Sequence, residues 1–477
     1  MNTRLKVIFV LNIFLLSFFQ TFSQNAEVPS FTLEDCIDYA LKNGIDIRNS
    51  KIDAQIAKAQ VGEIRAAGFP QIDGSVQLAH NAPLRRMFFI ATPENPILGN
   101  DPALATIPEG SVIALQNFFQ LPSSGDAGLN INQLIFNGSF IVGLRAAKTY
   151  QELASKTIDQ TRIQTVEQVT KAYYTVLINN ERRQLFEGNI ARVDSLLRNT
   201  RGLFQNGFAE KIDVDRVQVS LNNLMVEREK FNDLVKLSIE LLKFQMNYPM
   251  NQDLEIIGDA RDLRVDENIG EMVENFNYTD RIEFSILQTQ EALQKLDIQN
   301  NTSGYLPNLS AFANIGYFTQ SPYIKGLFRT ETSGLPENNF IGPDKWYKYG
   351  MFGLTLNVPI FDGLTKSYRV QQARLNLLKV QNGFELLRSS MDLQINQARI
   401  NLSNSLKALN AQQENVELAE EVARVTKIKY TEGVGSNLEV TEAETALREA
   451  QINYYNVLYD AVISQIDLKT ALGGLSK

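Results

Sequence analysis

The chain has 477 residues, of which 44% are hydrophobic and 21% charged, and its net charge is −8 at pH 7. An acidic chain of this kind is not expected to bind nucleic acid, whereas its length and apolar content allow large buried surfaces. The only cysteine, Cys36, excludes an intramolecular disulfide.

The first 23 residues are predicted to form a secretory signal peptide. Arg4 and Lys6 precede the apolar run VIFVLNIFLLSFF, and the small residues Thr21 and Ser23 precede the expected cleavage point. A retained membrane anchor is the alternative, but the run is shorter than the ~20 residues of a spanning helix. Cleavage would remove two positive charges and no negative ones, so that the net charge would change from −8 to −10.

A first helix is expected over TLEDCIDYALKNG. Cys36 occupies an apolar position in it. Lipid attachment at Cys36 is disfavoured, because Glu34 and Asp35 precede it where small residues would be expected.

Prolines divide the rest of the chain. Of 14 prolines, seven lie between Pro70 and Pro122 and five between Pro307 and Pro359. Because proline is excluded from helix interiors, helices are permitted over 30–69, 123–248, 250–306 and 360–477. GFPQIDGS in the first half corresponds to GYLPNLSA in the second, and NQLIFNG corresponds to NVPIFDG, which predicts a two-fold internal repeat.

Inside the two proline-rich windows the apolar period is two, which is typical of strands with one apolar and one polar face. Long loops, over about 81–120 and 320–346, join the two strands of each window and are expected to be exposed. The apolar members are Ile72, Val76 and Leu78; Leu129 and Ile131; Leu309, Ala311, Ala313 and Ile315, with Phe312 out of pattern; and Phe352, Leu354, Leu356 and Val358.

Outside the windows the period is helical. Apolar residues recur at alternating steps of three and four on both sides of Gly207 and Gly433, as in coiled coils. The runs from Gly138 to Gly207 and from Gly363 to Gly433 each have room for one helix of roughly 66 residues, on the order of 100 Å long. Such a helix is too long and too polar for a bilayer and is expected to stand in water.

Each strand pair leads into a long helix through a join with the pattern I-F-x-G. Gly138 marks the first join, and Pro359 and Gly363 mark the second, since a residue without Cβ suits a sharp junction. Four strands alone would leave edge N–H and C=O groups unpaired in lipid. A transmembrane sheet would therefore need strands from other protomers, and a soluble β-sandwich is the alternative.

The chain resembles the outer-membrane efflux proteins of the TolC family over essentially all of 31–472. The resemblance rests on TLEDCIDYALKNG, GFPQI, GYLPNL, LIFNG, VPIFDG, the turns FQNGFAEKIDV and YTEGVGSNLEV, and the closing IDLKTALGG. It implies a mostly α-helical fold with a transmembrane β part. In a homotrimer, each protomer would give four strands to one 12-stranded barrel, which a periplasmic coiled-coil tunnel continues.

The expected organisation follows the repeat. An extracellular loop is expected between the two strands of each repeat. The parts are the signal peptide 1–23; a first repeat 24–248 with a helix, strands about 69–80 and 124–136 and a helical hairpin 138–247; an equatorial segment 249–280; and a second repeat 281–477 with a helix, strands about 306–319 and 348–360 and a hairpin 363–472.

The resemblance places the periplasmic mouth at the helix turns around Gly207 and Gly433. Glu439 and Glu442 align with two acidic residues that ring the entrance in the family, and their i, i+3 spacing puts both carboxylates on one helix face. An acidic ring attracts cations. The alternative is an ordinary solvated helix start, where acids also suit the helix dipole.

The resemblance further implies polar contacts between the two hairpins that hold the mouth closed. Asp213 matches the carboxylate partner and Tyr430 the hydroxyl partner, but Gly435 stands in place of the basic member. Closure is therefore expected to depend on packing and on an Asp213–Tyr430 contact. The turns with Gly207, Gly433 and Gly435 are where adaptor tips are expected to dock.

These features predict an exit duct for tripartite efflux or type I secretion, in the outer membrane and extending into the periplasm. His80 lies in a predicted strand and no GxxxxGK[ST] loop is present, so no metal site, cofactor or enzymatic activity is expected. Energy would come from an inner-membrane pump of the RND, ABC or MFS type through a periplasmic adaptor (membrane fusion) protein. The alternatives are a general porin, which needs more strands than the four found, and a structural coiled-coil protein without a conduit.

Overall fold

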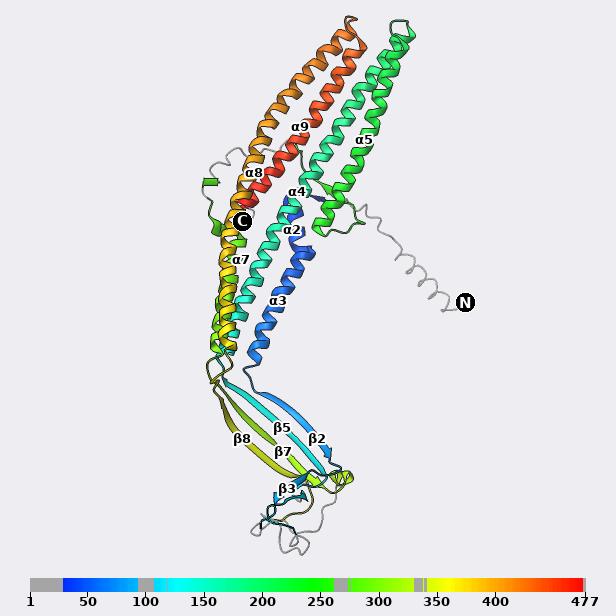
Figure 1. Ribbon diagram of the computed structural model, residues 1–477. Helices are drawn as coiled ribbons and strands as arrows, with labels where there is room; N and C mark the ends of the chain where they lie inside the picture. The colour runs from blue at the N-terminus through cyan, green and yellow to red at the C-terminus, as the bar shows by residue number, and fades with distance from the viewer. Residues whose placement is uncertain are drawn as a thin grey trace, which may run out of the picture. The chain divides into compact units, whose positions relative to one another are not determined.

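A computed structural model describes residues 29–92, 107–117, 119–260, 273–274, 276–329, 338 and 341–474 (Figure 1). The expected signal peptide, 1–23, lies outside these residues. The chain divides into two compact units. The helical unit combines 1–55, 152–289 and 381–477, and the strand unit combines 56–151 and 290–380.

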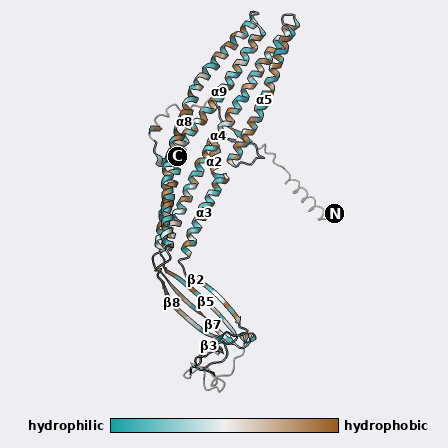
Figure 2. Cartoon of the chain, in the orientation of Figure 1, coloured by the Kyte–Doolittle hydropathy of each residue, from teal (hydrophilic) through white to brown (hydrophobic). Residues whose placement is uncertain are grey.

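The helices carry hydrophilic and hydrophobic residues along their whole length (Figure 2). Helices α4 and α8 contain 68 and 67 residues, so each long proline-free run forms one uninterrupted helix. Within the described ranges, no helix is both long enough and apolar enough to cross a membrane. The helices are α2 (Leu33–Asn43), α3 (Ile45–Ala66), α4 (Gly138–Gln205), α5 (Lys211–Met246), α7 (Ile282–Ser303), α8 (Thr365–Thr431) and α9 (Asn437–Ala471).

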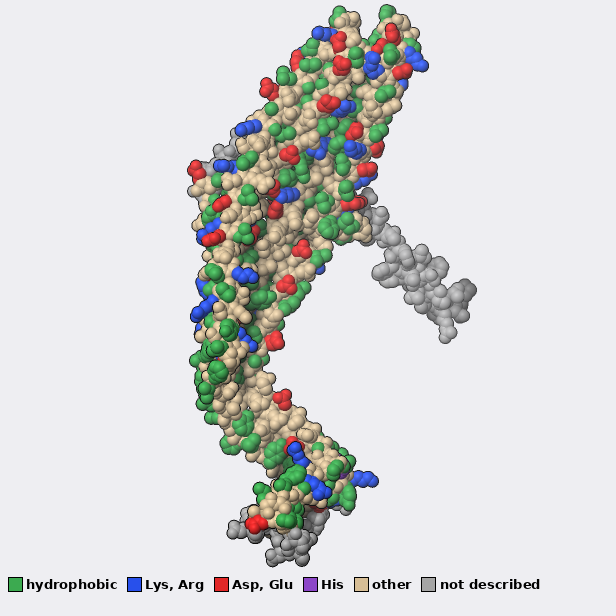
Figure 3. Space-filling view, in the orientation of Figure 1, with side chains coloured by type: hydrophobic (Ala, Val, Ile, Leu, Met, Phe, Trp, Pro, Cys, Tyr) green, Lys and Arg blue, Asp and Glu red, His purple; other side chains and the backbone are tan. Residues whose placement is uncertain are grey.

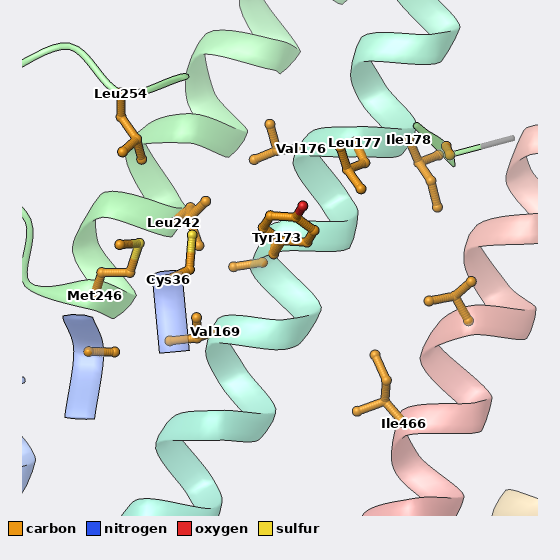
Figure 4. Close-up of a cluster of buried hydrophobic side chains, with 14 of the residues drawn as sticks. Cys36, Val169, Tyr173, Val176, Leu177, Ile178, Leu242, Met246, Leu254 and Ile466 are labelled. Atoms are coloured by element: carbon orange, nitrogen blue, oxygen red, sulfur yellow. The ribbon is translucent and has the colours of Figure 1, made fainter. Parts of the chain in front are cut away.

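The main core of the helical unit forms between α2, α4, α5 and α9 (Figure 4). Cys36 lies in it beside Tyr173 and Leu242 and is 0% exposed, so it serves as an apolar core residue. Burial, together with the charges of Asp35 and Glu34, raises the pKa of the Cys36 thiol to about 12. The thiol is therefore unreactive at neutral pH.

The segment after α5 packs against both ends of the described chain. Strand β6 (Glu255–Ile256) pairs in parallel with β1 (Ser30–Phe31). The Arg281 guanidinium donates to the Ala471 carbonyl oxygen at 2.8 Å, where α9 ends. These contacts lie within or next to 249–280, the segment expected to be equatorial. Residues 261–272 and 275 of that segment lie outside the described part.

The strand unit contains one antiparallel four-stranded sheet with the order β2-β5-β7-β8. Strands β2 and β8 are its edges. A separate hairpin, β3–β4, lies in the connection between β2 and β5 and was not expected from the sequence. The strands are β2 (Gln71–His80), β3 (Arg86–Ile90), β4 (Val112–Gln116), β5 (Ser123–Phe136), β7 (Asn308–Ser321) and β8 (Tyr347–Asn357).

The strand register places the alternating apolar residues on one face. Ile72 pairs with Ile131, which pairs with Ala313, which in turn pairs with Phe352, so one apolar row crosses all four strands. The opposite face carries polar residues such as Asp73 and Asn130. Figure 3 shows few charged side chains over the sheet and many over the helices. One face of the sheet is thus suited to lipid and the other to water.

The two strand-to-helix joins differ in detail. Gly138 is already the first residue of α4, whereas Gly363 has φ 66° in a turn before α8. A side-chain oxygen caps each helix start: Asn137 accepts from Phe140 N–H at 2.9 Å, and Asp362 accepts from Lys366 N–H at 3.0 Å.

The end of β8 differs from the expected boundary near residue 360. The strand ends at Asn357, two residues before Pro359, which has no N–H to donate to a ladder. The proline therefore belongs to the turn of the join and not to the strand.

Candidate functional site

The tips of the two helical hairpins have the same backbone geometry. At the first tip, Phe208 N–H donates to Leu203 O at 2.8 Å, and at the second, Val434 N–H donates to Lys429 O at 2.9 Å. The glycine before each donor, Gly207 or Gly433, has φ of 77° or 76°. This hydrogen-bond pattern is the Schellman helix end, and the left-handed backbone explains why glycine stands at both turns.

Each tip exposes one large apolar side chain at the position after the glycine. Phe208 is 81% exposed and Val434 is 79% exposed. Ile212 and Leu438, which also occupy equivalent positions in the two hairpins, are exposed as well. A pair of apolar side chains held at the ends of two hairpins is a surface suited to a protein partner.

The acidic pair on the second hairpin lies at the start of α9. Glu439 N–H donates to the Ser436 hydroxyl at 3.2 Å, so Glu439 belongs to the helix cap. Glu442 lies one turn further along the helix, and both are exposed. Within the described residues, neither carboxylate forms an ion pair with lysine or arginine.

The equivalent positions of the first hairpin are Asp213 and Arg216. Asp213 accepts from Glu210 N–H at 3.2 Å and forms an ion pair with Arg216 at 3.5 Å. Asp213 is therefore paired with a cation, whereas Glu439 and Glu442 have no ion-pair partner among the described residues. At these two equivalent positions, only the second hairpin has a net negative charge.

The expected contact between Asp213 and Tyr430 is not formed among the described residues. Asp213 instead caps its own helix. The Tyr430 hydroxyl lies 3.1 Å from the Thr200 hydroxyl of α4, and the buried Asn437 amide donates to the same Thr200 oxygen at 3.1 Å. Tyr430 does link the two hairpins, with Thr200 as its partner in place of Asp213.

Further polar contacts join α4 to α9 along the hairpins. Arg192 Nε donates to the buried Glu444 carboxylate at 2.9 Å, and Asn189 donates to Gln451 at 3.4 Å. Lys171 forms an ion pair with Asp467 at 2.5 Å. Along this row, residues later in α4 pair with residues earlier in α9. The two helices therefore pack antiparallel.

Lys171 lies in this row of contacts. Burial lowers the pKa of its amine, but hydrogen bonds to Asp467 and Glu167 outweigh that effect, and the net shift of the pKa is upward. The amine is therefore charged at physiological pH. The sequence alone did not identify this row, because each contact depends on the register between helices more than 200 residues apart.

We expect Arg192→Ala to loosen the two hairpins. The substitution leaves Glu444, whose side chain is 10% exposed, without its ion-pair partner. The local free energy of unfolding should fall by about 2 kcal/mol. Amide hydrogen exchange over 437–451 should accelerate by about thirtyfold, as measured by mass spectrometry on the purified protein.

Arg424→Ala is the matched control. Arg424 pairs with Glu421 on the same helix, and both side chains are about 60% exposed. Its loss should change hydrogen exchange by less than about twofold. Equal effects of the two substitutions would contradict the role of Arg192.

Two aromatic rings lie against glycines of neighbouring strands in the sheet. The Tyr349 ring lies against Gly316, and its hydroxyl donates to the Asp126 carboxylate at 3.1 Å. Phe312, out of pattern in the sequence, lies against Gly353 on β8. Rings on glycines stabilise the register of a sheet.

Within the described part of the chain, no group of three or more His, Cys, Asp or Glu residues could hold a metal ion. His80 lies in β2 and its Nδ1 is 2.9 Å from the Ser123 hydroxyl. This histidine belongs to the hydrogen bonding of the sheet.

The sheet, the paired hairpins and their capped tips define a class of protein: a membrane β-structure continued by helical hairpins that stand in water. The outer membrane efflux protein model matches residues 36–235 and 297–474, one match in each half. The chain belongs to the outer membrane efflux protein family.

Two curated relatives support this family assignment. The chain is 22% identical over 365 residues to the outer membrane protein TolC of Vibrio cholerae, covering 75% of this chain and 79% of that protein. It is 25% identical over 195 residues to the TolC of Escherichia coli, covering 40% of this chain and 38% of that protein.

Solved structures share the fold. The Campylobacter jejuni CmeC outer membrane channel superposes with a TM-score of 0.67 at 17% identity, covering 93% of this chain and 85% of that one. The open state of the Neisseria gonorrhoeae MtrE outer membrane channel superposes with a TM-score of 0.69 at 17% identity. The match covers 93% of this chain and 89% of that one. The outer edges of β2 and β8 are unpaired in the described protomer, so a closed barrel needs strands from other protomers.

Proposed function

We propose that this protein is the outer-membrane exit duct of a tripartite efflux or type I secretion system. Substrates delivered by an inner-membrane pump through a periplasmic adaptor would pass along the helical hairpins and leave through the barrel. The duct itself is passive, and the pump, of RND, ABC or MFS type, supplies the energy.

The observation that carries this proposal is the sheet with one apolar face, one polar face and two unpaired edges, whose strands lead into helical hairpins. On the polar face, Asp73 pairs with Asn130, which in turn pairs with Asn314. This row of polar side chains suits a water-filled lumen. The capped hairpins, in contrast, present polar and charged side chains to water (Figure 3).

Conductance in planar bilayers tests the duct. The purified trimer should form discrete ion-conducting channels, and a strain that lacks the gene should become more sensitive to exported compounds. A trimer that inserts without conducting would instead support a structural protein. A deletion strain that loses uptake but keeps its resistance would support a porin.

We expect the hairpin tips to dock the adaptor through Phe208 and Val434. A photo-crosslinking amino acid at either position should capture a periplasmic protein with a helical hairpin of its own, identified by mass spectrometry. Replacing both residues with serine should weaken the complex by about thirtyfold or more, since burial of one large apolar side chain contributes about 2 kcal/mol.

Lys236 is the matched control for the crosslinking. It lies on α5, its side chain is 75% exposed, and it is far along the helix from the tip. A crosslinker there should not capture the adaptor. Capture at Lys236 but not at the tips would place the docking surface elsewhere and leave the duct proposal intact.

A further inference from the structure

The hairpin β3–β4 presents an apolar face that nothing in the described protomer covers. Phe88 pairs with Ala114 and Ile90 pairs with Val112, which puts these side chains on one face. Phe88 and Val112 are each 71% exposed, and Ile90 is 59% exposed. A two-stranded hairpin is only marginally stable by itself, and a contiguous exposed apolar face marks an interaction surface.

The hairpin projects from the end of the sheet opposite the long helices. Strand β2 ends at His80, and Asn81 N–H donates to Pro122 O at 2.7 Å, which closes the neck of the connection. Leu121 N–H donates to the Gln320 side chain at 2.7 Å, which ties the neck to β7. Because the other strand ends lead into the periplasmic helices, the hairpin lies on the extracellular side.

Position along the sheet favours a second copy of this chain as the partner. Strand β2, from which the hairpin emerges, is an edge of the sheet. In the trimer this edge pairs with β8 of a neighbouring protomer. The hairpin therefore begins at the boundary between protomers, and a contact with the neighbour would continue an interface that the barrel already makes.

The lipid bilayer is a less suitable partner. Arg85 and Arg86 lie between the end of β2 and the apolar residues, and both are exposed. For Phe88 to reach hydrocarbon, these arginines would have to approach or enter the membrane, which is costly on the lipid face of a barrel. At the extracellular rim above the membrane they can stay in water.

We propose that the β3–β4 hairpins of the three protomers pack on one another through Phe88, Ile90 and Val112 and narrow the extracellular mouth of the barrel. The inference rests on the trimeric duct proposed above. The strands below the hairpins offer a polar lumen, so an apolar constriction would be the least hydrated part of the path and would lower the ion conductance.

Single cysteines test the contact. Val112→Cys should give covalent dimers when intact cells are treated with a short membrane-impermeant bis-maleimide, because each protomer then carries one reactive thiol. The native Cys36 does not interfere, because it is buried. Lys325→Cys, in the exposed η4 turn (Ile324–Phe328), should react with the reagent without giving comparable crosslinks and so shows that the extracellular loops are reached.

Conductance tests the constriction. Phe88→Asp combined with Val112→Asp should raise the single-channel conductance in planar bilayers at least twofold, while Lys325→Asp should leave it unchanged. Only variants that assemble as heat-resistant trimers are compared. If the charged pair prevents assembly, Phe88→Ser with Val112→Ser is used instead, with a smaller increase in the same direction.

Two results would overturn the proposal. Val112→Cys that reacts with a monofunctional maleimide but never crosslinks would show that the face is open to water. Val112→Cys that is protected from the reagent and also does not crosslink would show burial in lipid or in its own protomer. Absence of conductance in the wild-type trimer would instead refute the duct, and the crosslinking result would still decide the contact.

Discussion

Gly316→Val should abolish assembly of the barrel. A Cβ at Gly316 would lie 2.6 Å from the carbonyl oxygen of Ala127 and 2.8 Å from Cα of Gly128, both backbone atoms of the neighbouring strand β5. These atoms cannot move away without breaking the ladder between β5 and β7. The Tyr349 ring, 3.0 Å from the same point, blocks the remaining space.

The expected cost is more than about 3 kcal/mol in each protomer, at or above the upper end of ordinary overpacking, since valine adds two further methyl groups. Heat-resistant trimer in the outer-membrane fraction should fall at least tenfold on gels of unboiled samples. Gly350→Val is the matched control on β8, because a Cβ at Gly350 meets nothing within 4 Å. A normal amount of Gly316→Val trimer would contradict the packing described for this part of the sheet.

The same packing explains one feature that the sequence alone could not. The alternation of apolar and polar residues predicted the strands and their lipid face, because a strand's side chains alternate by geometry. Phe312 broke the pattern and had no interpretation. Its partner is Gly353, on a strand that follows about 40 residues later, so the reason for a phenylalanine on the polar face appears only once the register is known.

The hairpin tips show a similar division. Gly207 and Gly433 mark the turns in the sequence, because the left-handed backbone requires glycine or a close substitute. The role of Asp213 was harder to predict. An acid three residues after a turn can cap its own helix or reach a neighbour, and composition does not distinguish the two. The structure shows the cap, with Glu210 N–H as the donor.

The connection between β2 and β5 could be recognised in the sequence only as a long exposed loop. The spacing of its prolines leaves room for the short strands Arg86–Ile90 and Val112–Gln116. However, a run of five residues with adjacent apolar side chains shows no clear alternation of apolar and polar residues, so a strand cannot be predicted from it. The hairpin is therefore found from backbone pairing. Its exposed face is also a property of the fold, since the sequence does not tell which of its apolar residues are covered.

Glu439→Gln combined with Glu442→Gln should weaken the attraction of the periplasmic mouth for cations. We propose that two carboxylates from each of three protomers surround the axis there. A monovalent cation about 8 Å from one carboxylate gains about 0.5 kcal/mol in water, and the whole ring about 3 kcal/mol. Screening at 0.15 M salt reduces this to about 1.1 kcal/mol, so the cation-to-anion permeability ratio should fall by about sixfold or more.

The first hairpin explains why the effect should depend on these two residues. There the equivalent acid Asp213 is already paired with Arg216, so at this level of the hairpins the acids without an ion-pair partner are Glu439 and Glu442. Glu417→Gln with Glu420→Gln is the control, an exposed pair with the same i, i+3 spacing on α8 away from the tip, and should change the ratio by less than about twofold. Reversal potentials across a salt gradient measure the ratio. Equal falls for both pairs would mean that the selectivity comes from the overall acidity of the hairpins, and Glu439 and Glu442 would then be an ordinary helix start.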